Sequence, residues 1–206
     1  MRSFQPQPLA AYKRTIAQPP GEKHSVKARL EQCIALMVLT LIAPLLVLIA
    51  AVILMTSGRP ILFLQTRQGQ HHQGFNIFKF RTMEKNKVTP IGTVLRQCGL
   101  DELPQLWNIV RGEMSWVGPR PLTKNDIERL QWTRAYYQKR WLVKPGITGL
   151  AQLYGGIGKK VTWLCDRRYV EKWSPLLDCQ IIIASALICF LGKRRVRQVL
   201  YRWRQK

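Results

Sequence analysis

Two adjacent acids, Asp101 and Glu102, stand just ahead of Pro104. Proline is tolerated in the first turn of a helix, so the pair is predicted at a helix start, where free backbone NH groups and the helix dipole favour ionised carboxylates. Acids in such a position commonly do no more than stabilise the helix end. Ionised carboxylates are also what a hard metal ion or a phosphorus centre requires, so the pair is a candidate catalytic site.

Two groups of cationic residues could complement these acids. Alternation along a predicted strand places Lys79 and Arg81 on one face, where they could hold a phosphate; a solvated basic face is the alternative. Arg120 lies between Pro119 and Pro121, which fix their own φ angles and push the arginine towards an extended conformation. A guanidinium with so little freedom left to lose suits a phosphate, although a plain turn with an exposed arginine fits the same residues.

The elements that would carry these side chains are a hairpin and short helices. Two arms, Pro60–Gly69 and Phe75–Met83, are predicted to pair as a β-hairpin around a polar turn. Asn125 with Glu128 resembles a capping box, which predicts a helix running to about Trp141.

A glycine-rich turn follows that helix in the sequence. Gly146 and Gly149 belong to the stretch KPGITGLAQ at 144–152, and a turn of this composition can direct backbone NH groups at an anion. The pattern is short, so a purely structural turn accounts for it equally well.

An uncharged run extends from Gln32 to Gly58, and its core at 33–55 is almost wholly apolar. At about 1.5 Å per residue, this core is long enough to cover the ~30 Å hydrocarbon layer of a bilayer. Pro44 in its middle predicts a kink. Both flanks are basic, and positive charge prefers the cytoplasmic side. A helix that bends at Pro44 and leaves by the face it entered satisfies both flanks, and a kinked spanning helix is the alternative.

Composition limits the class of protein. The 206 residues include 33 Lys and Arg against 11 Asp and Glu, a formal charge of +22, while 47% are hydrophobic. The hydrophobic content excludes a disordered basic tail protein, and the charge fits nucleic acid, an anionic membrane or a substrate rich in phosphate. Five cysteines without a CxxC pair argue against a disulfide framework or a zinc site. The basic and aromatic tail at 193–206 suits a helix on an anionic membrane surface, or a solvated tail.

Over residues 28–192 the chain resembles the bacterial sugar transferase family, the monotopic phosphoglycosyl transferases. Three stretches in the family's order carry the resemblance: FKFRTM at 78–83, LDELPQLWNIVRGEMSWVGPRP at 100–121 and PGITGLAQ at 145–152. Single residues that add to it are Gln65, Arg67, Gly69 and Arg96.

The resemblance implies a mostly helical α+β fold with a small β-hairpin, interfacial helices and a re-entrant helix-break-helix anchor. The implied division is a basic tail at 1–27, the anchor at 28–58, a catalytic domain at 59–192 and a basic interfacial tail at 193–206. Pro44 would form the break of the anchor, and the remaining structural positions are Pro119, Pro121, Gly146 and Gly149. The catalytic domain would lie on the cytoplasmic face of the bacterial inner membrane.

The resemblance also implies an activity: transfer of a sugar 1-phosphate from a UDP-sugar to undecaprenyl phosphate, with release of UMP. Asp101 matches the nucleophile, Glu102 its partner, and both are expected to bind Mg²⁺. Lys79, Arg96 and Arg120 fall where the family keeps basic residues near the phosphates, and Arg81 joins them as a candidate from its strand position. Expected partners are the UDP-sugar, the polyprenyl phosphate and anionic lipid, without nucleic acid; an oligomer is possible.

Two other readings compete with an enzyme. One is a membrane-anchored basic protein that holds nucleic acid or an acidic polymer, which the charge and interleaved aromatic residues would suit. The other is a non-catalytic membrane scaffold. The binding protein would have no use for an acidic pair beside rigid arginines, so UMP release from UDP-sugars separates the alternatives.

Overall fold

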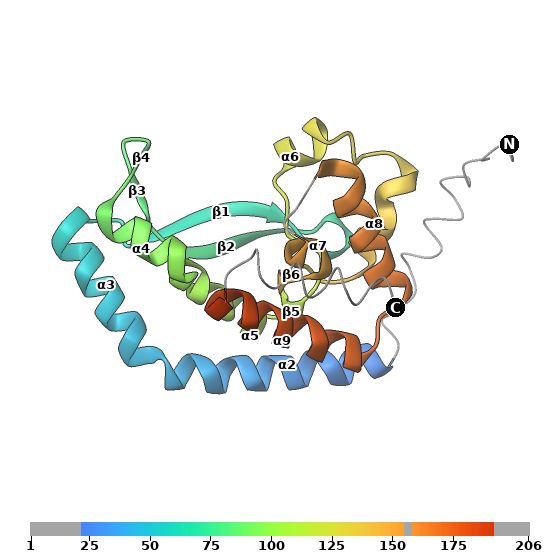
Figure 1. Cartoon of the computed structure of the whole chain (residues 1–206), viewed down its shortest axis with the longest axis horizontal. Helices are drawn as coiled ribbons and strands as arrows, with labels where there is room; N and C mark the ends of the chain where they lie inside the picture. Colours follow the sequence, from blue (N-terminus) through green and yellow to red (C-terminus); the bar gives the residue numbers. More distant parts are fainter. Residues whose placement is uncertain (1–21, 155–157, 192–206) are drawn as a thin grey trace, which may run out of the picture.

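The computed structural model of the chain describes residues 22–154 and 158–191. The tail predicted at 193–206 lies outside these residues, as does most of the tail predicted at 1–27. Within the described part the fold is mostly helical with three two-stranded sheets, which confirms the α+β expectation (Figure 1).

A β-hairpin lies at the centre of the molecule, as predicted. Strands β1 (Leu62–Gln68) and β2 (Gly74–Phe80) pair antiparallel, joined through the 3-10 helix η1 (Gln70–His72). A smaller hairpin of β3 (Met83–Glu84) and β4 (Lys87–Val88) projects from one end (Figure 1).

Two helices form a long bent arm along one side of the molecule (Figure 1). Helix α2 (Glu22–Leu41) and helix α3 (Ala43–Ser57) meet at Ile42 with a bend of 60°. Pro44 lies in the first turn of α3, where its missing NH costs no helical hydrogen bond, so the predicted kink is confirmed. Among the described residues no single helix is long and apolar enough to cross a membrane, whereas this bent pair has the length and composition. Insertion of the pair into a membrane stays a prediction.

The hairpin packs against this arm through two apolar clusters. Phe75 and Ile77 of β2 bury against Ala35 of α2 and against helix α5 (Leu106–Val110). Phe80, at the other end of β2, buries against α3 and helix α4 (Pro90–Cys98). Both helices of the arm are therefore part of the core, although many of their other apolar side chains are exposed.

A second sheet links the arm to the C-terminal helices. Strand β5 (Ser115–Val117) pairs in parallel with β6 (Gly146–Thr148). Glu31 of α2 accepts a hydrogen bond from Ser115 Oγ (2.8 Å) on its carboxylate, and its backbone carbonyl accepts one from Trp116 Nε1 (3.3 Å). Helix α2 is thus hydrogen-bonded directly to β5.

Helices α7 (Leu150–Leu153), α8 (Gly158–Glu171) and α9 (Pro175–Leu191) complete the fold. Each of them contributes a buried residue to one apolar cluster with Val117 of β5. Helix α9 lies beside α2 (Figure 1), where Lys27 Nζ is 2.8 Å from Asp178 Oδ2.

The prediction of a continuous helix from Asn125 to Trp141 is wrong. The capping box is formed by Thr123 and Asp126, two residues earlier than expected, and helix α6 (Lys124–Arg129) has a single capped turn before the chain reverses. Gln131 takes a left-handed conformation with φ of 54°, which an α-helix cannot accommodate.

The chain continues as the 3-10 helix η3 (Ala135–Leu142). Trp132 and Trp141, on either side of this reversal, are buried together with Trp163 of α8. These tryptophans are therefore core residues and not part of a lipid interface.

Candidate active site

Asp101 and Glu102 lie in the first turn of the 3-10 helix η2 (Leu100–Gln105), which runs directly into α5. Gly99 precedes them in the left-handed conformation (φ 70°), a geometry that ends α4 and starts η2 within one residue. The prediction of acids at a helix start is confirmed. Pro104 falls near the end of η2 and not in its first turn, just ahead of the start of α5.

Lys79 projects from β2 onto this turn and forms an ion pair with Glu102. Asp101 beside them is half-buried. Burial raises the pKa of Asp101, the charge of Glu102 raises it further, and Lys79 and Arg96 oppose both effects. The two acids, Lys79 and Arg96 therefore share one electrostatic environment.

Arg96 reaches the site from the last turn of α4, and its Nε donates to Thr82 Oγ1 (2.8 Å). Helix α4 approaches Thr82 so closely that a Cβ on Gly92 would lie 2.2 Å from the Thr82 carbonyl oxygen. The position of Arg96 is thus set by a backbone contact and by a hydrogen bond to the segment that follows β2.

Arg81 does not join Lys79 in the structure. Its guanidinium donates to the carbonyl oxygens of Ser57, Gly58 (2.8 Å) and Arg59 (3.3 Å), at the end of α3. These contacts give Arg81 a structural role at the end of α3, and its role with substrate stays a prediction.

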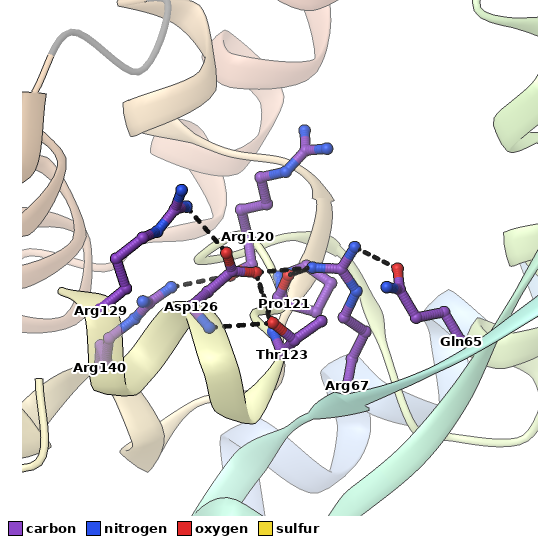
Figure 2. Close-up of polar contacts among 8 residues, drawn as sticks. All are labelled: Gln65, Arg67, Arg120, Pro121, Thr123, Asp126, Arg129 and Arg140. Carbon is purple, nitrogen blue, oxygen red and sulfur yellow. Dashed lines mark hydrogen bonds and ion pairs between the residues drawn. The ribbon is translucent and has the colours of Figure 1, made fainter. Parts of the chain in front are cut away.

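Arg120 lies in the segment after β5, within electrostatic reach of Arg67. Its side chain is exposed and extends away from the turn (Figure 2). Within residues 22–154 and 158–191 its guanidinium makes no hydrogen bond or ion pair. The backbone of the turn, in contrast, is well held: the carbonyl of Pro119 accepts from Gly146 N (3.0 Å), and that of Arg120 accepts from Arg140 Nη2 (2.8 Å).

Gly146 and Gly149, which were predicted as structural positions, lie against this turn. A Cβ on Gly146 would lie 2.1 Å from Gly118 N, and one on Gly149 would lie 2.1 Å from Gly118 O. The NH of Gly146 is already donated to Pro119. Their glycine identity is explained by the close passage of two backbone segments.

Sequence reasoning gave no role to Arg67, which the structure places between the two parts of the site. Its Nη1 lies 3.3 Å from Asp126 Oδ2 and 3.4 Å from the carbonyl oxygen of Pro121, and its Nη2 donates to Gln65 Oε1 (Figure 2).

Burial lowers the pKa of Arg67; Asp126 opposes that effect, Arg120 adds to it, and Glu102 opposes it. Arg67 thus lies within electrostatic reach of both Arg120 and Glu102. The spacing of Gln65, Arg67 and Gly69 in the first arm was the sequence feature that could have indicated this position of Arg67.

Asp101 and Glu102 are the two carboxylates of this site that could bind a metal ion. In the described part of the chain, no three His, Cys, Asp or Glu side chains gather as a complete metal site. Mg²⁺ usually keeps several waters and takes only one or two protein carboxylates together with substrate phosphates. Asp101 and Glu102 are a donor set of that kind, so the residues fit a magnesium ion shared with a diphosphate.

Comparison with known proteins gives several similar chains. The undecaprenyl-phosphate glucose phosphotransferase of Komagataeibacter xylinus is 40% identical over 176 residues, covering 73% of this chain and 33% of that protein. The UDP-glucose:undecaprenyl-phosphate glucose-1-phosphate transferase of Escherichia coli K12 is 34% identical over 196 residues, covering 84% and 42%. The exopolysaccharide production protein ExoY of Sinorhizobium fredii is 33% identical over 190 residues, covering 77% and 83%.

The chain spans less than half the length of the first two relatives and most of the third. A family model described as bacterial sugar transferase matches residues 22–192, which include the bent arm, the hairpin, the acidic turn and the Pro-Arg-Pro segment. The chain therefore belongs to the bacterial sugar transferase family.

Proposed function

We propose that this protein transfers a sugar 1-phosphate from a UDP-sugar to a polyprenyl phosphate such as undecaprenyl phosphate. The observation that carries the proposal is the placement of Asp101 beside the Glu102–Lys79 ion pair, with Arg96 in the same electrostatic environment. Such a site offers a carboxylate nucleophile and fixed positive charge to one phosphorus centre. The names of the relatives from K. xylinus and E. coli support the same reaction class.

The reaction has two displacements at the phosphorus that carries the sugar. A carboxylate oxygen of Asp101 attacks this phosphorus, the bond to the bridging oxygen breaks, and UMP leaves with the electron pair. An oxygen of the polyprenyl phosphate then attacks the same phosphorus. The bond to Asp101 breaks, which restores the carboxylate and yields polyprenyl-diphosphate-sugar.

The cationic side chains offset the repulsion between a carboxylate and a diphosphate. Lys79 and Arg96 would act at the attacked phosphate, and Arg120 would offer its exposed guanidinium fork to the outer oxygens. Mg²⁺, held by Asp101 and Glu102, would supply further charge neutralisation at the diphosphate when bound. Glu102 keeps Lys79 directed at the site through their ion pair.

The proposed setting is the cytoplasmic face of the bacterial inner membrane. The exposed apolar side chains of α2 and α3 would enter the lipid, and the excess of basic residues would attract the anionic leaflet and both anionic substrates. A bent arm that enters and leaves by one face would hold the site where a soluble nucleotide and a lipid-borne phosphate meet.

The test is UMP release from a panel of UDP-sugars with Mg²⁺ and undecaprenyl phosphate. We expect turnover with at least one sugar, and a fall of about 10³-fold or more for Asp101→Asn, because loss of a covalent nucleophile removes the main route. Mass spectrometry of the protein incubated with UDP-sugar but without carrier should detect the phosphosugar adduct on Asp101. The matched control is Glu128→Gln, which removes an exposed acid of α6 and should retain adduct formation.

Full activity of Asp101→Asn would eliminate the covalent route. Absence of UMP release from every UDP-sugar, by a folded wild-type protein in membranes, would eliminate the transferase itself.

A further inference from the structure

Arg140 is a buried cation that the proposed reaction does not use. It is 2% exposed, and its Nη2 lies 3.3 Å from Asp166 Oδ2, whose side chain is equally buried. The guanidinium carbon lies 4.6 Å from the ring centre of Trp132 and 4.8 Å from that of Trp141. The guanidinium is thus enclosed by two indole rings and one carboxylate.

Such an arrangement is poorly explained by stability alone. Removing a guanidinium and a carboxylate from water is costly, and apolar residues of similar volume commonly replace buried ion pairs without loss of stability. The cost here is only partly offset, because Nε and Nη1 of Arg140 are buried without a hydrogen-bond partner in the described chain. We therefore look for the role of Arg140 in its hydrogen bond to the backbone.

That contact is the hydrogen bond from Arg140 Nη2 to the backbone carbonyl of Arg120 (2.8 Å), visible in Figure 2. Pro121 contributes no NH, so this carbonyl is the only hydrogen-bonding group of the Arg120–Pro121 peptide. A fixed donor on the carbonyl fixes the rotation of that peptide, and with it the direction in which the Arg120 side chain leaves the backbone.

We infer that Arg140, with Asp166 as its counter-ion, is a positioning residue that fixes Arg120 for contact with a substrate phosphate. The inference rests on the proposed function, which gives Arg120 that contact. Arg120 itself has an exposed fork without a partner in the described chain, so its orientation depends on its backbone. Arg140 and Arg120 also line one small hollow, together with Pro119 and Gln68.

The variant that isolates this role is Arg140→Met combined with Asp166→Leu, which removes both charges and leaves neither buried alone. We expect its unfolding temperature to stay close to that of the wild type. We expect kcat/KM for the UDP-sugar to fall about 10- to 100-fold, the loss that a displaced positioning contact typically causes. Lys139→Met is the matched control: it removes the neighbouring cation, which pairs with Glu171 at the surface, and should leave kcat/KM unchanged.

A double-mutant cycle with Arg120→Ala separates positioning from a general structural effect. If Arg140 acts through Arg120, the Arg140→Met/Asp166→Leu change should have little further effect on kcat/KM once Arg120 is truncated. The same fold-loss in both backgrounds, or wild-type kcat/KM in the folded double variant, would overturn the inference.

Should the double variant fail to fold, Arg140→Lys carries the same cycle, because it keeps the charge beside Asp166 and loses only the planar fork. An equal loss with and without Arg120 would again overturn the inference.

Hydrogen exchange provides a readout that does not depend on turnover. The peptide covering 115–123 should exchange faster in the double variant than in Lys139→Met, and unchanged exchange there would count against the inference. A wild-type protein that releases no UMP would refute the proposed function separately, without affecting this measurement.

Discussion

The proposed attack on phosphorus requires an ionised Asp101, yet the surroundings of this residue favour the protonated form. Burial and the charge of Glu102 raise its pKa above the ordinary value of 3.8. The pH at which half of the Asp101 carboxyls are ionised is therefore higher than for an exposed aspartate. Catalysis by this residue should thus be lost, as the pH falls, earlier than an ordinary aspartate would require.

The pH dependence of kcat/KM for the UDP-sugar checks this expectation. Glu102→Gln removes a charge that raises the pKa of Asp101, so the acid limb of the profile should move to lower pH even though the maximal rate falls. Glu128→Gln removes an exposed acid of α6 and should leave the limb in place. A limb that responds equally to both variants would indicate that a group other than Asp101 is titrating.

At the residue scale the sequence identified the charged groups but not all of their partners. The adjacency of Asp101 and Glu102 and the prolines around Arg120 are local, and local patterns can be read directly. The pairing of Arg140 with Asp166 joins positions 26 apart that resemble ordinary surface charges, and only folding buries them together. The contacts of Arg81 were also missed, because the carbonyls at the end of α3 that accept from its guanidinium are distant in sequence.

At the scale of elements, strong local signals were reliable and weaker ones were not. The hairpin and the break near Pro44 were predicted because strand alternation and proline geometry leave few alternatives. The helix expected up to Trp141 was wrong because burial of Trp132 and Trp141 in one cluster requires the chain to reverse at Gln131. That requirement comes from tertiary packing, which helical spacing of aromatic residues does not reveal.

The parallel pairing of β5 with β6 requires a glycine at position 146, and this requirement can be tested. A Cβ on Gly146 would lie 2.1 Å from Gly118 N, so Gly146→Ala should force the two segments apart and cost about 2 kcal/mol or more of unfolding free energy. Gly74→Ala is the control, since its Cβ would meet nothing closer than 3.7 Å. Its effect should stay within about 1 kcal/mol.

Thermal unfolding in one detergent, followed by circular dichroism, would compare the two glycine variants. Gly146→Ala should also lower kcat/KM, because the same separation moves the Pro-Arg-Pro turn that Gly146 N supports. Equal unfolding temperatures for both variants would show that the segments can separate without cost.

At the scale of the whole molecule, the exposed apolar surface of the bent arm needs a partner. Leu41 at the bend is 79% exposed, Val47 is 69% exposed and Met55 is 85% exposed. In a re-entrant anchor the bend would be the deepest point in the lipid. Leu41→Lys should then weaken membrane association by on the order of 2 kcal/mol, because a charge in the hydrocarbon layer is costly.

Co-sedimentation with vesicles that contain anionic lipid measures this effect. Val161→Lys is the matched control, since Val161 is an exposed apolar residue of α8 outside the arm. Its substitution should not weaken binding. Equal binding of both variants would place the bend outside the lipid, and a similar loss for both would indicate a general effect of the added charge.

The hydrogen bonds from β5 to Glu31 give the site a fixed height. The carboxylate and carbonyl of Glu31 hold Ser115 and Trp116, and β5 leads within a few residues to Arg120. With α2 in the membrane as proposed, the Pro-Arg-Pro turn is held at a fixed distance from the lipid surface. The head group of a carrier then determines whether its phosphate reaches this turn, and the length of its buried tail does not.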